Sequence, residues 1–102
     1  MKKYNLTITP KAKNDMREIS NYLARFSLDI SVRYSKYINK AIQSLCTMPE
    51  RCALVRDDVL REYGYRWIPA KSYIIYFTVD KNANLVRIER ILHAKQEYAV
   101  IL

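Results

Sequence analysis

The side chains best suited to chemistry are an imidazole and several cations near the end of the sequence. His93 is the single histidine, and it can act as a general acid or base or serve a purely structural role. Arg66, Lys71 and Lys95 lie close in sequence to the ends of predicted strands. Together with His93 they can form a basic cluster that holds phosphates or the acidic side chains of a partner, although an ordinary solvated rim is the alternative.

Two further arginines lie within the last predicted strand. Arg87 and Arg90 are three residues apart, so simple alternation of side chains places them on opposite faces of that strand. Arg90 is therefore a candidate binding residue alongside the basic cluster. Tyrosine is frequent, with nine in the chain, and exposed Tyr and Trp rings are favoured interface anchors. The aromatic residues expected at the surface are Tyr63, Tyr65, Trp67 and Tyr98.

Other catalytic chemistries find little support in the sequence. Asp57 and Asp58 are adjacent in a predicted loop, where neighbouring carboxylates rarely converge on one substrate. Cys46 and Cys52 are too far apart for a Cys-x-x-Cys pair, and a single histidine cannot complete a zinc site. No glycine-rich phosphate loop is present. We therefore expect no metal and no cofactor, and two reduced thiols.

The composition predicts one folded domain with an acidic partner. A chain of 102 residues, half of them hydrophobic, supports a single domain spanning residues 1–102. Eighteen Lys and Arg against ten Asp and Glu give a formal charge of +8, which favours binding to nucleic acid or an acidic protein; simple solubility is the alternative. No apolar run could span a bilayer and no signal-like stretch occurs, so we expect a cytoplasmic protein.

The segment 73–93 provides the scaffold for these residues. Residues 73–79 are almost entirely β-branched or aromatic, as in a strand buried on both faces, and residues 85–93 predict a second strand after a short polar loop. The two strands should pair antiparallel. Residues 66–70 predict a third strand that either lies at an edge or is broken at Pro69, and residues 59–63 are interpreted as strand-like.

The first half of the chain predicts a strand and two helices. Residues 4–9 alternate apolar and polar, and Thr9-Pro10 is a typical helix start. Apolar residues then recur at helical spacing up to Phe26 and again from Ile30 to Leu45, with Asp15 among the residues expected to face water. The fold class is α+β: an antiparallel sheet covered on one face by a helical hairpin, in the order β-α-α-β-β-β. The other sheet face should remain open to solvent or to a partner.

The order of these motifs resembles the RelE/ParE superfamily of bacterial toxins. The resemblance rests on residues 15–23 of the first helix, on residues 64–68 and 73–80, and on Val-Arg-Ile-Glu-Arg-Ile-Leu-His at 86–93. It covers nearly the whole chain and implies the same two-layer fold. It also implies a type II toxin–antitoxin pair, in which a cognate antitoxin, often acidic, wraps and silences the toxin.

The resemblance is closer to the ParE-like branch. RelE-like members cut messenger RNA in the ribosome and usually carry an Arg at the start of the central strand and a basic residue after the last one. Those places hold Tyr73 and Gln96 here. We therefore expect a ParE-like toxin that binds and inhibits DNA gyrase without an active site of its own. The alternatives are a ribosome-dependent ribonuclease using His93, Lys95 and Arg66, or a non-toxic protein-binding member; a homodimer is also left open.

Overall fold

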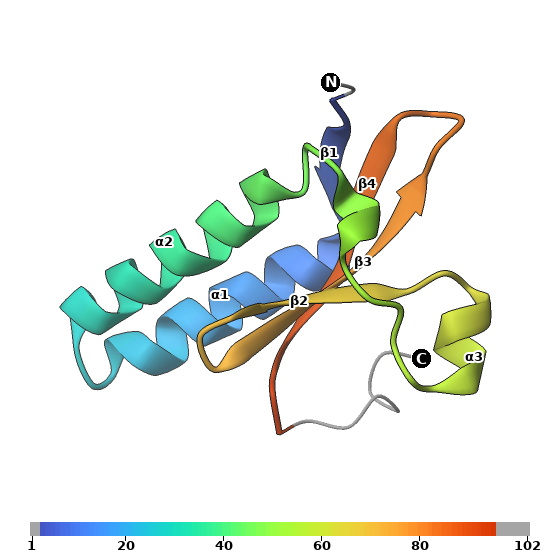
Figure 1. Cartoon of the computed structure of the whole chain (residues 1–102). Helices are drawn as coiled ribbons and strands as arrows, with labels where there is room; N and C mark the ends of the chain where they lie inside the picture. The colour runs from blue at the N-terminus through green and yellow to red at the C-terminus, as the bar shows by residue number, and fades with distance from the viewer. Residues whose placement is uncertain (1–2, 96–102) are drawn as a thin grey trace.

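The protein folds into two layers, and a small third helix lies on the far side of the sheet (Figure 1). The computed structural model describes residues 3–95. The predicted order β-α-α-β-β-β is confirmed, with α3 inserted before the last three strands. The elements are β1 (Asn5–Ile8), α1 (Pro10–Ala24), α2 (Leu28–Ser44), the 3-10 turn η1 (Pro49–Arg51), α3 (Asp58–Glu62), β2 (Arg66–Ala70), β3 (Tyr73–Asp80) and β4 (Leu85–His93).

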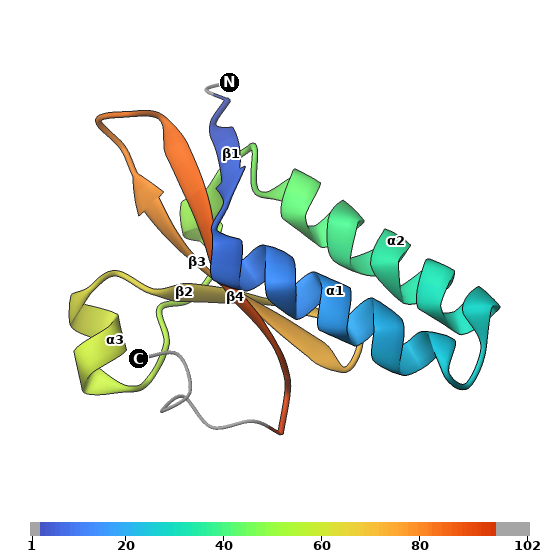
Figure 2. The same cartoon turned by 180° about the vertical axis from the view of Figure 1, so that it is seen from behind.

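The two long helices begin where the capping residues predict. The Thr9 hydroxyl accepts a hydrogen bond from the Ala12 amide (3.1 Å), and Pro10 occupies the first helical position, where its missing N–H is not needed. Ser27 caps α2 in the same way through the Ile30 amide (3.3 Å). The link between the helices is so short that they form an antiparallel hairpin, which covers one face of the sheet (Figures 1 and 2).

The sheet has the strand order β1-β4-β3-β2 and is mixed. The three C-terminal strands form an antiparallel ribbon, as the hairpin signal predicts. The N-terminal strand β1 adds to the other side of β4 and runs parallel to it, with Asn5 opposite Leu85 and Ile8 opposite Ile88. The purely antiparallel sheet that we expected therefore holds only for β2, β3 and β4.

The larger core lies between the helical hairpin and the sheet. Ile75, Phe77 and Ile88 from the strands are fully buried there. Ile38 and Ile42, on one face of α2, pack into the same cluster at 2% and 1% exposure. These residues follow the helical and strand periodicities of the sequence. The same periodicity also placed Phe26, Ile30 and Tyr37 on the packing faces, and there it was wrong, since they are 71%, 37% and 38% exposed.

Residues 59–63 are helical, so the strand-like interpretation was wrong. The Asp57 carboxylate accepts a hydrogen bond from the Leu60 amide (3.0 Å) and starts α3, a five-residue helix. Leu60 then packs with Val55, Tyr76 and Leu92 into a second core on the opposite sheet face. That face is therefore partly covered rather than fully open.

A β-bulge changes the positions of the two β4 arginines. Tyr76 lies opposite Arg90 but Phe77 lies opposite Ile88, which leaves Glu89 as the extra residue of β4. Because Phe77 and Ile88 face the helices, both arginines start from the other face of the sheet. The prediction that Arg87 and Arg90 leave the strand on opposite faces was wrong, because simple alternation does not anticipate a bulge, although the Arg90 guanidinium reaches back to Asp15 of α1.

Candidate functional site

Three of the predicted site residues meet at one end of the molecule, beside the β2–β3 turn and the end of β4. Tyr73 pairs with His93 across the strands, and the Ala94 amide donates to the Ser72 carbonyl (2.8 Å). Lys71 precedes this pair in the turn, and Lys95 follows it, exposed to solvent. The Lys95 amide donates to His93 Nδ1 (3.2 Å), so that nitrogen is an acceptor here. We call Tyr37, Lys71, Tyr73, His93 and Lys95 the strand-end surface.

Lys71 is held in an unusual backbone conformation. Its φ angle is +58°, in the left-handed region that most residues other than glycine avoid. The Lys71 ammonium lies 4.4 Å from the centre of the Tyr37 ring, a cation–π contact. The turn and this contact together hold one cation over the exposed side of α2.

A row of aromatic rings forms the floor of this end of the molecule. The ring centres of Tyr37 and Tyr34 are 6.0 Å apart, those of Tyr34 and Tyr73 are 6.0 Å apart, and those of Tyr73 and His93 are 5.4 Å apart, all edge to face. Burial raises the pKa of Tyr73, and the nearby Tyr22 and Tyr34 hydroxyls raise it further.

Two hollows flank the aromatic row. One, of about 210 Å³, lies between α2 and the β2–β3 turn and carries Lys71 and Arg33 on its rim. The other, of about 450 Å³, lies beside α1 and is lined by Glu18, Ile19, Tyr22, Tyr73 and His93. A surface with aromatic rings, cations and hollows is well suited to bind the anchoring side chains of a protein partner.

Arg66 and Trp67 lie away from the strand-end surface. Arg66 pairs with Phe77, four residues along the sheet from the Ala70–Tyr73–His93 row, a separation of about 13 Å. The Arg66 guanidinium donates to the Cys52 carbonyl (2.6 Å) and to the Glu50 carbonyl (3.3 Å). Trp67 is half-buried against the second core. The basic cluster of Arg66 with His93 that the sequence suggested is therefore not assembled.

Arg90 forms a buried ion pair with a residue that we expected to face water. Arg90 Nε lies 2.7 Å from Asp15 Oδ2, and the two side chains are 16% and 8% exposed. This hydrogen bond, with the charge of Asp15, raises the pKa of Arg90. The same Asp15 oxygen accepts from the Ile91 amide (3.0 Å), at the part of β4 that extends beyond β1. Asp15 thus satisfies an edge of β4 that no other strand of residues 3–95 covers.

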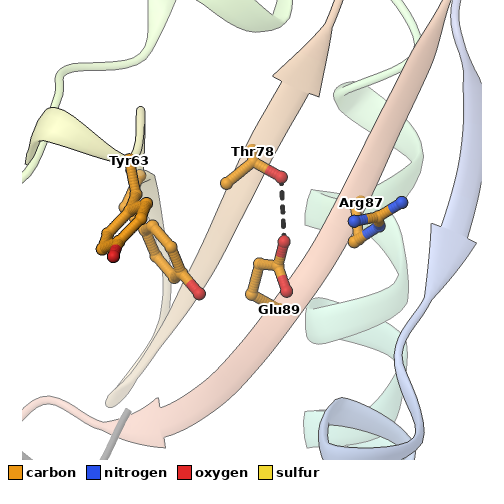
Figure 3. Close-up of a pocket in the computed structure, with 5 residues that line it drawn as sticks. Tyr63, Thr78, Arg87 and Glu89 are labelled. Atoms are coloured by element: carbon orange, nitrogen blue, oxygen red, sulfur yellow. Dashed lines mark hydrogen bonds between the residues drawn. The ribbon is translucent and has the colours of Figure 1, made fainter. Parts of the chain in front are cut away.

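A cavity on the sheet face away from α1 and α2 was not anticipated as a site. It has a volume of about 420 Å³ and is lined by Tyr63, Tyr65, Thr78, Arg87 and Glu89 (Figure 3). Burial and the charge of Glu89 raise the pKa of Tyr65. The sequence predicted both tyrosines at the surface. It did not predict that Thr78, Arg87 and Glu89 lie beside them, because the bulge and α3 bring these residues together.

The remaining predictions concern metals, thiols, membranes and the C-terminus. No group of three or more His, Cys, Asp or Glu within residues 3–95 could hold a metal ion, and both cysteines are free and half-buried. Burial raises the pKa of the Cys52 thiol. None of the helices in that range combines the length and apolar character needed to cross a bilayer. Tyr98 lies outside the described residues.

Comparison with known structures first identifies the fold. The fold matches a chain from the chromosomal ParDE toxin–antitoxin system of P. aeruginosa, with a TM-score of 0.74 and 18% identity over 93% of this chain and 100% of that one. It also matches a chain of the RelBE2 toxin–antitoxin complex of Mycobacterium tuberculosis, with a TM-score of 0.59 and 18% identity over 89% and 98%. The chain thus shares the fold of these two chains.

The family follows from the sequence. Residues 6–98 match the family described as the ParE toxin of the type II toxin–antitoxin system parDE. The chain therefore belongs to the ParE toxin family. No curated protein sequence matches it.

Proposed function

We propose that this protein is a type II toxin that inhibits DNA gyrase by binding, and that a cognate antitoxin neutralises it. The observation that carries the proposal is its place in the ParE toxin family, where residues 6–98 match. The geometry supports a binding mechanism, because the cations needed for phosphodiester chemistry do not converge: Arg66 is tied to backbone carbonyls about 13 Å along the sheet from His93.

The strand-end surface is our candidate for the contact with the target or with the antitoxin. It combines a cation held over a ring, a row of aromatic side chains and two hollows. Large rigid rings bury much area for little lost entropy, and such residues dominate the free energy of protein interfaces. The +8 charge favours an acidic partner, and the two structural neighbours come from toxin–antitoxin systems.

Purified protein should inhibit DNA supercoiling by purified gyrase. We expect Lys71→Asn and His93→Ala each to raise the concentration needed for half-inhibition about tenfold. Asparagine tolerates the left-handed conformation at position 71, so Lys71→Asn removes the cation without adding backbone strain. Lys36→Asn, an exposed cation on α2, is the matched control and should inhibit like the parent protein.

Normal supercoiling at molar excess of toxin would contradict the proposal. The second candidate function is then a ribosome-dependent ribonuclease, for which primer extension on translated messages would show codon-linked cuts that His93→Ala abolishes. If neither activity appears, and expression without the antitoxin leaves growth unchanged, the protein is a non-toxic binding module of the family.

A further inference from the structure

We propose that the cavity on the sheet face away from α1 and α2 is a nucleotide-binding pocket. Its volume of about 420 Å³ is in the range of small-molecule sites, and it is lined by Tyr63, Tyr65, Thr78, Arg87 and Glu89. It lies on the opposite face of the sheet from the large core and is separate from the strand-end surface. The inference does not rest on gyrase as the target, because it follows from the contents of this cavity alone.

One wall of the cavity offers aromatic rings to a base. Tyr63, next to the end of α3, is 69% exposed, and its ring stands beside the cavity (Figure 3). Tyr65 lines the same cavity and is held by backbone hydrogen bonds to Leu60 and Val55 (3.0 Å each). Burial and the charge of Glu89 raise the pKa of Tyr65 above its ordinary value, so its hydroxyl remains a hydrogen-bond donor. Such rings stack on any base, since every base has a π face.

The opposite wall offers a cation, Arg87. Its guanidinium is exposed and forms no hydrogen bond or ion pair within residues 3–95. Figure 3 shows its side chain on the far side of Glu89 from Tyr63. A guanidinium pairs with phosphate through two parallel hydrogen bonds, so Arg87 is placed to hold the phosphate of a base stacked on the tyrosines.

The floor between these walls is suited to read the edge of a base. Thr78 Oγ1 donates to Glu89 Oε2 (2.9 Å), which orients the carboxylate, and the other carboxylate oxygen has no partner within residues 3–95. A carboxylate accepts hydrogen bonds only, so it favours an edge that presents N–H donors. Guanine presents two adjacent donors, a ring N–H and an amino group, and is therefore the base that we expect the pocket to prefer.

The pocket binds rather than cleaves. Its described lining contains neither histidine nor lysine, and His93 is four residues further along β4 than Glu89, about 13 Å away. Glu89 is assigned here to the edge of the base, so no histidine or lysine of the described lining is left to move a proton at a bound phosphodiester. The ligand is a nucleotide with one base in the pocket, either free or within a single strand.

Calorimetric titration of the purified protein with GMP, CMP, inorganic pyrophosphate and a short single-stranded oligonucleotide tests the proposal. We expect GMP to bind more tightly than CMP, and pyrophosphate more weakly than either. A much tighter oligonucleotide would identify a single strand as the source of the base, and equal affinities would identify a free nucleotide. Backbone amide shifts of Thr78, Arg87 and Glu89 in a nitrogen–proton correlation spectrum should locate the bound ligand.

Three variants distinguish the pocket from general charge attraction. Tyr63→Ala and Arg87→Gln should each weaken GMP binding about tenfold, and both residues are exposed enough for the fold to survive. Glu89→Gln retains an acceptor for Thr78 but should abolish the preference for GMP over CMP. Lys36→Gln, which removes the same charge on α2, should leave binding unchanged. Equal losses in Arg87→Gln and Lys36→Gln, or no binding at millimolar nucleotide, would overturn the proposal.

Discussion

At the scale of single residues, Asp15 illustrates how one side chain can join two layers. Its carboxylate neutralises Arg90 and accepts from the Ile91 amide, so it stabilises the edge of β4 from the first turns of α1. Replacement by alanine leaves a mostly buried guanidinium and a backbone N–H without their partner. We expect Asp15→Ala to lower the free energy of unfolding by about 3 kcal/mol in a urea or guanidinium titration.

A second Asp–Arg pair provides the control for this prediction. Asp29 and Arg33 form an ion pair one helical turn apart on α2, with side chains 71% and 62% exposed. Solvent screens such a pair, so Asp29→Ala should change the free energy of unfolding by less than about 1 kcal/mol. Asp15→Asn retains an acceptor for Ile91 and should fall between the two. Equal effects of Asp15→Ala and Asp29→Ala would show that the buried pair contributes no more than the exposed pair.

At the scale of elements, α3 is the part of the fold on which the second core depends. Leu60 is fully buried among Val55, Tyr76 and Leu92, whereas its neighbour Val59 is 50% exposed. Leu60→Ala should lower the free energy of unfolding by about 2 to 4 kcal/mol, because a cavity is left behind. Val59→Ala should change it by less than about 1 kcal/mol. A similar loss for both variants in denaturant titrations would mean that α3 does not pack as described.

The elements of the fold differ in how well the sequence alone predicts them. The ribbon of β3 and β4 was predictable because its β-branched and aromatic runs are long, and the start of α1 because Thr9 and Pro10 cap a long periodic segment. The helix α3 was not, since five residues carry too little periodicity to separate helix from strand. The bulge at Glu89 and the parallel pairing of β1 depend on contacts between distant segments, which local patterns do not encode.

The candidate site residues also differ in how far the sequence alone could predict their surroundings. Lys71, His93 and Lys95 could be grouped from the sequence because each lies next to the end of a strand. The start of β3 and the end of β4 meet at one end of the hairpin. The partners of Arg66 and Arg90 could not, because they come from η1 and α1. The order of motifs predicted the toxin family correctly, whereas the roles of single side chains stay predictions.

At the scale of the whole molecule, the +8 charge has two possible explanations, and the salt dependence of association distinguishes them. If the charge attracts an acidic antitoxin, it acts over roughly a Debye length, about 10 Å at 0.1 M salt, and speeds the encounter of the two proteins. If it serves only solubility, association is insensitive to salt. We expect the association rate constant with the antitoxin to fall at least tenfold between about 50 mM and about 500 mM salt, measured by stopped-flow fluorescence.

The free energy of unfolding provides the internal control for this last prediction. The ion pair of Asp15 with Arg90 is largely shielded from solvent, so stability should change little over the same salt range while the association rate falls. Replacing two exposed cations of α2 in the double variant Lys36→Gln, Lys40→Gln should lower the association rate at low salt and leave the dissociation rate nearly unchanged. A rate independent of salt in both proteins would assign the positive charge to solubility instead.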